Sequence, residues 1–385
     1  PGTWRYPHIY GSPRYHLWTL ATLGWRVIYV EPPVQWRWSR RWWEAPDRPF
    51  FVLSPARVPP FGVRMAFAKW QGNLCRAITS RGLITQTQRA LIEHNIQPTM
   101  LWFGAPWHFS LAKRLDPNIP RVFHVYDELR ESPAFTPRQR ALLARWEDAL
   151  LKQVDIVLCS SQPQQQRRAP LAKDTMLLEN GIPDSFLPEN RPEPAEETKR
   201  LLRQVEKLER PLYLYGGVVD HRLDPTYFRA LADRIIRGTV VFAGKLDPTL
   251  DPAFRRFLET HPRIHLTGPV PHEAYPHLYE LANCLLLAHR RTPFTDAMLP
   301  EKLHEYLSSG RPIVSVPLPE VARIAQENGL QNTIFVIETA DEFVRKCAKL
   351  ATGTIPFHES DGPNAIREKT WNNLAVKLHR RLIKF

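Results

Sequence analysis

Cysteine is scarce in this sequence, since 385 residues contain only Cys75, Cys159, Cys284 and Cys347. The four are far apart and show no C-x-x-C spacing, which argues against a disulfide framework and against a zinc site. Long apolar runs are also missing: none approaches the roughly 20 residues that span a bilayer, and no signal peptide is visible. No D-x-D motif stands at an expected strand end. These absences favour a cytoplasmic protein, soluble or peripheral to a membrane, that uses neither a metal nor another cofactor.

Acidic residues are in the minority, with 39 Asp and Glu against 52 Lys and Arg and a formal net charge of +13. Residues 1–100 alone hold 13 basic and 4 acidic residues, and ten of the 12 tryptophans lie at or before Trp107. The segment 36–43 (WRWSRRWW) and a predicted amphipathic helix over 64–94 combine both features. Such a surface suits an anionic bilayer interface or single-stranded nucleic acid. Any single Trp is explained more simply by packing beneath a solvated loop.

Helical and strand patterns alternate over most of the chain, which predicts an α/β fold with parallel sheets. The expected strands of the first half are 25–30, 100–103, 121–126, 155–159 and 175–178, and the expected helices are 15–23, 64–94 and 137–153. The expected strands of the second half are 212–215, 239–243, 264–267, 284–288, 313–316 and 334–337, with helices at 225–236, 252–260, 274–281 and 300–309. We therefore expect two Rossmann-like, doubly wound domains, which bind ligands at the carboxyl ends of their strands.

The domain boundaries follow from a change in composition. Residues 188–199 (PENRPEPAEETK) are polar, rich in Pro and Glu and without apolar periodicity, so we expect them to be a linker. The N-terminal domain then covers residues 1–187 and the C-terminal domain covers 200–366. Residues 367–385 form a basic predicted helix.

Two segments of the second half have residue types that suit a nucleotide diphosphate. The pair Gly216–Gly217 follows an expected strand, where glycine lets backbone N–H groups approach a phosphate, and Arg222 adds a cationic fork. Alone, such a pair is better explained as a tight turn. The second segment is a polar loop that enters a predicted helix at Pro300, with Lys302 and Glu305 on one helix face. Here the ammonium group favours an anion, and the carboxylate can accept hydrogen bonds from both hydroxyls of a ribose.

The segment 268–321 resembles the donor-binding half of retaining, GT-B-fold glycosyltransferases of the family-4 type. It is most similar to the bacterial branch with the signature P-x-K-L-x-E-Y-L-x-x-G-[KR]-P, which reads PEKLHEYLSSGRP at 300–312. Residues 180–183 (NGIP) resemble the N-G-[VI] turn that precedes the donor domain, and residues 16–33 resemble the first βαβ unit. The resemblance is specific in the second half of the chain and diffuse in the first.

The resemblance implies transfer of a hexose from a UDP- or GDP-sugar, bound by the C-terminal domain, to a glycan or lipid-linked acceptor bound by the N-terminal domain. Glu305 matches the second glutamate of the E-x7-E motif and is the expected ribose contact, while Lys302 and Arg222 would neutralise the leaving diphosphate. Val270 would frame the nucleobase through backbone groups. The implied donor-binding residues are Gly216, Gly217, Arg222, Val270, Met298, Leu299, Lys302 and Glu305. In GT-B enzymes, a helix such as 367–385 often crosses back to the N-terminal domain, and we expect the same here.

One position departs from the family pattern. Ala297 stands eight residues before Glu305, where the E-x7-E motif has its first glutamate. Asp296 or Glu301 could replace the missing carboxylate, or backbone groups of 295–299 could hold the sugar. Because the bacterial branch often lacks this glutamate, we interpret the change as a mark of the subtype and not of inactivity.

Asp127 is the main candidate on the acceptor side. It ends the sequence FHVYD after a predicted strand, where the family has His-Asp or Asp-Asp, and would position the acceptor or handle its proton. Glu128 and His124 are the next candidates, and an N-cap role for Asp127 is an equally good interpretation. The expected catalytic residues are Asp127, Arg222 and Lys302. Retention needs a carboxylate nucleophile or same-face attack with the departing phosphate as base, and the family favours the second.

Three functions remain open. The first is a retaining glycosyltransferase that builds a cell-surface or exported polysaccharide, and the second is a GT-B epimerase or phosphorylase. The third is a catalytically silent GT-B protein that serves as a partner or lipid-binding subunit, for which Ala297 is the motive. The expected partners are a nucleotide-sugar donor, a glycan or lipid-linked acceptor and the anionic inner face of the cell membrane. Nucleic acid is not expected, because no RNA-binding motif is present.

Overall fold

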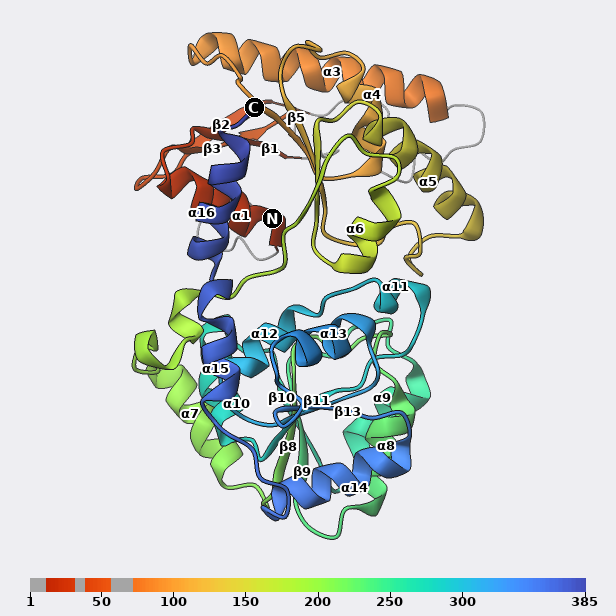
Figure 1. The fold of residues 1–385 in the computed structure, drawn as a ribbon, viewed down its shortest axis with the longest axis vertical. Helices are drawn as coiled ribbons and strands as arrows, with labels where there is room; N and C mark the ends of the chain where they lie inside the picture. Colours follow the sequence, from red (N-terminus) through yellow and green to blue (C-terminus); the bar gives the residue numbers. More distant parts are fainter. Residues whose placement is uncertain (1–11, 32–38, 57–71) are drawn as a thin grey trace. The chain divides into compact units, whose positions relative to one another are not determined.

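The computed structural model describes residues 12–31, 39–56 and 72–385 (Figure 1). The chain divides into two compact units. The first unit comprises Pro1–Glu179 and Asn372–Phe385, and the second unit comprises Asn180–Trp371. The first break therefore lies between residues 179 and 180, before residue 187, where the sequence placed the end of the first domain.

A four-stranded parallel sheet in the order β4-β5-β6-β7 forms part of the core of the first unit. Its strands are β4 (Leu101–Phe103), β5 (Arg121–Val125), β6 (Ile156–Cys159) and β7 (Thr175–Leu177), and its helices include α4 (Phe109–Ala112), α5 (Pro137–Leu151) and α6 (Gln162–Arg168). The start of α5 is fixed by a capping box, in which Thr136 and Gln139 exchange hydrogen bonds between side chains and backbone N–H groups. Pro137 occupies the first helical position, where its missing N–H costs nothing.

A three-stranded sheet in the order β1-β3-β2 forms another part of the first unit. Its strands are β1 (Val27–Val30), β2 (Arg41–Glu44) and β3 (Phe50–Ser54); α1 (Ser12–Thr22) precedes them and α3 (Gly72–Glu93) follows. Strand β3 pairs in parallel with β1 and antiparallel with β2. The end of the Trp-rich segment is thus a strand and not a loop. Residues 36–38 of that segment and 64–71 of the predicted long helix lie outside the described residues.

The C-terminal helix α16 (Trp371–Leu382) packs on the first unit. Leu374, Leu378 and Leu382 are spaced by four residues and so lie on one helix face. They form a buried cluster with Leu20 of α1 and with side chains of the four-stranded sheet, namely Val122, Ile156, Leu158 and Leu178. The chain thus returns to its first unit after completing the second.

The second unit is built on a six-stranded parallel sheet in the order β10-β9-β8-β11-β12-β13. The strands are β8 (Leu212–Gly216), β9 (Thr239–Ala243), β10 (Ile264–Gly268), β11 (Cys284–Leu287), β12 (Ile313–Ser315) and β13 (Ile334–Val336). In chain order this is 3-2-1-4-5-6, the doubly wound Rossmann-like arrangement, whose ligands bind where the order reverses, between β8 and β11. The predicted α/β fold with parallel, Rossmann-like sheets is confirmed.

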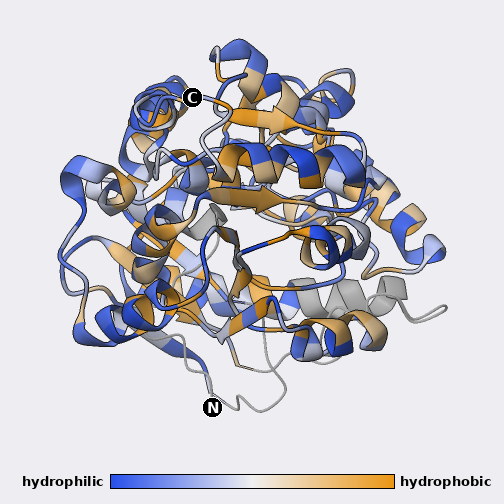
Figure 2. Ribbon diagram, turned by 90° about the horizontal axis from the view of Figure 1, so that it is seen from below, coloured by the Kyte–Doolittle hydropathy of each residue, from blue (hydrophilic) through white to orange (hydrophobic). Residues whose placement is uncertain are grey.

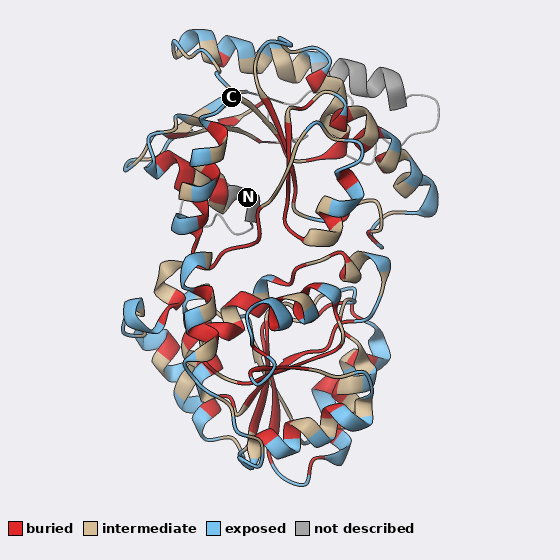
Figure 3. Cartoon of the chain, in the orientation of Figure 1, coloured by how far each residue is buried: buried red, intermediate tan, exposed pale blue. Residues whose placement is uncertain are grey.

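Helices cover the sheet of the second unit, and their starts are set by local sequence signals. They are α7 (Glu196–Glu206), α8 (Pro225–Arg234), α9 (Pro252–Thr260), α10 (Tyr275–Leu281), α11 (Pro293–Asp296), α12 (Glu301–Leu307), α13 (Pro319–Glu327), α14 (Ala340–Ala351) and α15 (Asp361–Ile366). Asp224 and Asp251 cap α8 and α9 through their side chains, each directly before a proline. The strands are mainly apolar and, apart from the partly buried edge strand β10, almost wholly buried (Figure 3), whereas the helices carry apolar and polar residues side by side (Figure 2).

Residues 188–199, expected to link the domains, lie inside the second unit. Arg191 anchors them, because its Nη2 donates to the Phe186 carbonyl at 2.7 Å and its Nη1 forms an ion pair with Glu280. Part of the acidic composition that suggested a linker comes from Glu196 and Glu197. These two residues occupy the first turn of α7, where their negative charges interact favourably with the positive end of the helix dipole.

Within the ranges that the structure describes, no helix combines the length and the apolar character needed to cross a membrane.

Candidate functional site

The glycine pair at the end of β8 makes room for two side chains. A Cβ on Gly216 would lie 2.6 Å from Cε1 of Tyr279, and a Cβ on Gly217 would lie 2.3 Å from Cε of Lys302. Gly217 also has a φ of +114°, which side-chain-bearing residues rarely adopt. The two backbone N–H groups are already used, Gly216 donating to the Tyr306 hydroxyl at 2.9 Å and Gly217 to a carbonyl of β9 at 2.7 Å. The pair therefore provides space beside the backbone, where the sequence had suggested free N–H donors.

Lys302 lies over the end of β8 and forms no ion pair within the described part of the chain. Its Nζ is 5.6 Å from the ring centroid of Tyr215, and among the described residues no carboxylate lies within 4.0 Å of it. Burial and the nearby charge of Arg222 lower the pKa of Lys302, while Glu305 and Glu301 act in the opposite direction. The first turn of α12 thus presents a lysine at the point where the strand order reverses.

Glu305 stands one turn further along α12 and is held by two hydrogen bonds. Tyr279 donates its hydroxyl to Oε2 at 3.0 Å, and Nε2 of His272 lies 3.3 Å from Oε1. Burial by itself would raise the pKa of Glu305, but the contacts with His272 and Tyr279 and the charge of Lys302 outweigh it and lower the pKa. Conversely, Glu305 raises the pKa of His272 against the opposing effect of burial. The carboxylate is therefore kept ionised and fixed in orientation, with a side chain that is 14% exposed.

Arg222 is already paired within its own loop. Its guanidinium binds both carboxylate oxygens of Asp220, with distances of 3.0 Å from Nε and 2.6 Å from Nη2. The pairing lowers the pKa of Asp220 despite the opposing effect of burial. Because Asp220 neutralises much of the charge, Arg222 contributes less positive potential than the sequence suggested.

His289 follows β11 on the other side of the reversal point and is 2% exposed. Burial, with smaller contributions from Lys302 and Arg222, lowers its pKa to about 3, so the imidazole is neutral. Its Nδ1 has no hydrogen-bond partner among the described residues. This residue received no role in the sequence analysis, and its one sequence signal is its position directly after a strand.

The loop that leads into α12 is anchored from the start of the unit. His304 donates from Nδ1 to the Asn180 carbonyl at 2.7 Å, and the Asn180 side chain donates to the Leu299 carbonyl at 3.4 Å. Ala297 and Leu299 are buried, whereas Met298 is only partly so. Asp296, one candidate for the missing carboxylate, is bound by Arg291 through two hydrogen bonds. Val270 is partly buried beside the core of the unit.

Asp127 belongs to the first unit, whereas Lys302 and the residues around it belong to the second. It is exposed directly beyond β5, and the next helix is capped by Thr136, so the side chain is no helix cap. The alternative candidate Glu128 is buried and forms hydrogen bonds to both Nη atoms of Arg168 at 2.9 and 3.1 Å. The other alternative, His124, is fully buried, and burial lowers its pKa to about 3.

The structure thus brings together Gly216, Gly217, Lys302 and Glu305, with Arg222 nearby, all in the second unit. Sequence reasoning missed the residues that hold this group, namely Asp220, His272, Tyr279 and Tyr306, and also the buried His289 beside it. They come from different strand ends and helices, so no local motif connects them. Over the described residues, no group of three or more His, Cys, Asp or Glu side chains is arranged to hold a metal ion.

Part of the second unit matches a known protein family, and the chain is similar to a curated protein. Residues 197–352 match the model of a family described as Glycosyl transferases group 1. The chain is 22% identical over 257 residues, or 64% of its length, to TuaH of Bacillus subtilis (strain 168), named as a candidate teichuronic acid biosynthesis glycosyltransferase. The alignment spans 60% of that relative's length.

Solved structures resemble the whole chain. A sucrose-phosphate synthase from Thermosynechococcus elongatus superposes with a TM-score of 0.69 at 16% identity, over 97% of this chain and 92% of its own. A structure from E. coli titled trehalose-6-phosphate bound with UDP-2-fluoro glucose gives 0.67 at 10% identity, over 99% and 98%. The fold is that of the GT-B glycosyltransferases, and the findings together support a glycosyltransferase.

Proposed function

We propose that this protein transfers a hexose from a UDP- or GDP-sugar to a glycan or lipid-linked acceptor with retention of configuration. The observation that carries the proposal is the position of Lys302 and of the ionised, hydrogen-bonded Glu305 on one face of α12, at the reversal point of a 3-2-1-4-5-6 sheet. A lysine of this kind binds a diphosphate, and the carboxylate binds the two hydroxyls of a ribose. The match to Glycosyl transferases group 1 over 197–352 includes both residues.

In the proposed site, each residue has a definite task. Glu305 accepts hydrogen bonds from the ribose, and its low pKa means that it binds as a carboxylate at neutral pH. Lys302 neutralises the charge that develops on the diphosphate as the bond to the sugar breaks, which is the main electrostatic requirement of the transfer. Gly217 leaves space for that lysine. Val270, Met298 and Leu299 would contribute backbone groups around the base and the sugar.

Retention is proposed to proceed by attack on the face from which the nucleotide leaves, with the departing phosphate as the base. Two carboxylates of this region, Asp220 and Asp296, are each bound by an arginine, which makes them poor nucleophiles. Asp127, exposed beyond β5, is the proposed group that positions the acceptor hydroxyl.

The acceptor side is proposed to work at an anionic membrane surface. The name of TuaH, which refers to teichuronic acid biosynthesis, and the basic first 100 residues support this. Part of the basic, Trp-rich segment already has partners in its own unit, because Trp42 stacks on His94 at 3.9 Å and Arg40 forms an ion pair with Glu93. Flotation with anionic vesicles tests this element, and an equal affinity for neutral vesicles would rule it out.

A catalytically silent GT-B protein is the second candidate. Ala297 is buried where the family motif has a glutamate, and the neighbouring Asp296 is held by Arg291. The two candidates are separated by a thermal-shift screen of the full chain against UDP, GDP and their sugars. Stabilisation by one nucleotide and its sugar, followed by an NMR assay in which the product keeps the donor's anomeric configuration, supports the transferase. A nucleotide-stabilised protein that releases no nucleotide with any acceptor extract supports the silent protein.

A further inference from the structure

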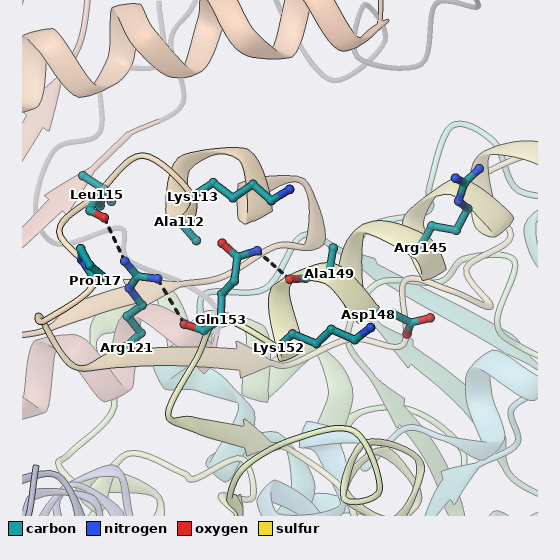
Figure 4. Close-up of a pocket in the computed structure, with 10 residues that line it drawn as sticks. All are labelled: Ala112, Lys113, Leu115, Pro117, Arg121, Arg145, Asp148, Ala149, Lys152 and Gln153. Carbon is teal, nitrogen blue, oxygen red and sulfur yellow. Dashed lines mark hydrogen bonds between the residues drawn. The ribbon is translucent and has the colours of Figure 1, made fainter.

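The first unit contains an open cavity of about 670 Å³ between α4 and the end of α5 (Figure 4). Its lining includes four cationic side chains: Lys113, Arg121, Arg145 and Lys152. Its volume lies within the range of small-molecule sites, roughly 300 to 1,000 Å³. It is therefore large enough for more than a single ion.

The cations of this cavity have no acidic partners. Among the described residues, no carboxylate lies within 4.0 Å of the side-chain nitrogens of Lys113, Arg121, Arg145 or Lys152. Asp148 is the one acidic residue in the lining, and its carboxylate lies 3.2 Å from Arg130, which is not in the lining. The cavity thus has an excess of positive charge and focuses a positive potential.

Arg121 is the most informative member because it is buried, with 7% exposure. Its guanidinium donates to three backbone carbonyls, those of Leu115 and Asp116 at 3.0 Å and Gln153 at 3.3 Å, and its Nε has no partner. Carbonyl groups satisfy hydrogen bonds but carry no net charge. A buried cation without a counter-ion is costly, so its presence favours an anion that comes from outside the chain.

Another buried arginine of the same unit has carboxylate partners. Arg168 is fully buried and binds two glutamates, Glu128 at 2.9 Å and Glu147 at 2.9 Å. Two carboxylates bind the guanidinium of Arg168, whereas among the described residues none lies within 4.0 Å of the guanidinium of Arg121; Asp155 accepts a hydrogen bond from the backbone N–H of Arg121 at 2.9 Å. The difference marks the Arg121 cavity as a place where charge is left for a ligand.

We propose that this cavity binds a phosphate group with an organic substituent, carried by a soluble phosphate ester or by a phospholipid headgroup. Phosphate matches the chemistry because its charge of about −2 and its several acceptor oxygens suit a cluster of Lys and Arg. The site is distinct from the proposed acceptor position. Arg121 begins β5 and Asp127 follows its other end, so the strand separates them by about 17 Å.

The test uses two exposed members of the lining, so that folding is preserved. Isothermal titration of the full chain with inorganic phosphate and with glycerol 3-phosphate is compared between the wild type and Arg145→Ala/Lys152→Ala. The matched control is Arg138→Ala/Arg140→Ala, which removes the same charge from the first turns of α5, outside the cavity. We expect saturable binding that falls about tenfold or more in the cavity variant, because each charged hydrogen bond is worth more than a neutral one, and no change in the control.

Two further arms identify the source of the phosphate and exclude the nucleotide site. Flotation with phosphatidylglycerol and phosphatidylcholine vesicles assigns the ligand to a lipid headgroup if only the cavity variant loses its preference for phosphatidylglycerol. In the Lys302→Ala background, which removes the proposed diphosphate contact, Arg145→Ala/Lys152→Ala is expected to cause the same loss of glycerol 3-phosphate binding as in the wild-type background. Equal binding by cavity and control variants in both arms overturns the proposal, and so does loss of phosphate binding in Lys302→Ala alone.

Discussion

The hydroxyl of Tyr279 donates a hydrogen bond to Oε2 of Glu305 at 3.0 Å, and the ring of the same tyrosine lies against the backbone of Gly216. One side chain from α10 thus contacts both a carboxylate of α12 and the end of β8. The glycine is required because a Cβ there would meet the tyrosine ring. Glu305 is therefore positioned before any ligand arrives, which reduces the ordering cost of binding.

Tyr279→Phe tests this positioning. The ring and its packing are kept, while Glu305 loses one of its two fixed hydrogen bonds, so we expect nucleotide affinity to fall about three- to tenfold. Titration calorimetry with the nucleotide that stabilises the wild type measures the change. Tyr227→Phe is the matched control, because the hydroxyl of Tyr227 donates to the backbone carbonyl of Glu338 and makes no contact with Glu305. Equal affinities in wild type and Tyr279→Phe would mean that Glu305 needs no such support.

His272 makes the stability of the second unit depend on pH. Its pKa is raised in the folded state by Glu305, so the contribution is complete below about pH 6.5 and is lost as the pH rises through the raised pKa. Glu305 has a lowered pKa, so its own contribution persists until the pH falls below the ordinary range of a glutamate. We expect His272→Gln to cost about 1 kcal/mol in urea unfolding at pH 6 and less at pH 8.5.

The control compares Glu305→Gln with the double variant Glu305→Gln/His272→Gln. The difference in their free energies of unfolding should not change with pH, because the carboxylate that raises the pKa of His272 is gone. A constant difference between wild type and His272→Gln across this range would show that the two side chains are not coupled.

Gly217→Ala separates backbone strain from contact with Lys302. Gly217 and Gly329 both have positive φ values, +114° and +67°, but a Cβ on Gly329 would meet nothing within 4 Å. We expect Gly329→Ala to cost about 1 kcal/mol from strain alone and to leave nucleotide affinity unchanged. Gly217→Ala should cost more and should also weaken nucleotide binding, because the added methyl group displaces the lysine. If Gly217 serves only to form a turn, both variants should lose about the same free energy of unfolding and both should keep the nucleotide affinity of the wild type.

Glu128 is expected to stabilise the first unit and to take no direct part in catalysis. Its carboxylate binds Arg168, and both side chains are fully buried. Removing it in Glu128→Ala deletes two charge-assisted hydrogen bonds and leaves Glu147 as the remaining carboxylate partner of Arg168, so we expect a loss of about 2 to 3 kcal/mol in the free energy of unfolding. Glu131→Ala, which removes an exposed contact with Arg167 at 3.4 Å, should cost less than about 1 kcal/mol. Urea unfolding of both variants compares the two, and a fully stable but inactive Glu128→Ala protein would restore Glu128 as a catalytic candidate.

Local signals in the sequence predicted much of the second unit. Strand 239–243 and helix 252–260 have the same bounds in the structure, because a continuous apolar run and an Asp-Pro start leave little ambiguity. The segment 188–199 was misassigned because a polar, proline-rich composition is shared by linkers and by the approach to a helix. The strand at Arg41–Glu44 was missed because two adjacent tryptophans flanked by charged residues do not show the alternation typical of a half-buried strand.

The sequence predicted the two central residues of the candidate site, Lys302 and Glu305, but not the residues that contact them. Lys302 and Glu305 share a helix, so their spacing alone places them on one face. The contacts of Glu305 come from Tyr279 and His272, which lie 26 and 33 residues away in the chain. Only the packing of α10 and the loop after β10 brings them there, and no spacing rule expresses it. The ion pair between Arg222 and Asp220 was also missed, because the conformation that brings the guanidinium to the carboxylate cannot be read from two charged residues in one loop.

The central claim is that the second unit binds the nucleotide of a sugar donor through Glu305. Titration of UDP and GDP into the full chain, into Glu305→Ala and into the exposed control Glu206→Ala tests it most directly. We predict binding of one nucleotide by the wild type and the control, and at least about tenfold weaker binding by Glu305→Ala, because two charge-assisted hydrogen bonds to the ribose are lost. The same affinity in all three proteins, or no binding of either nucleotide by the wild type, would contradict the account.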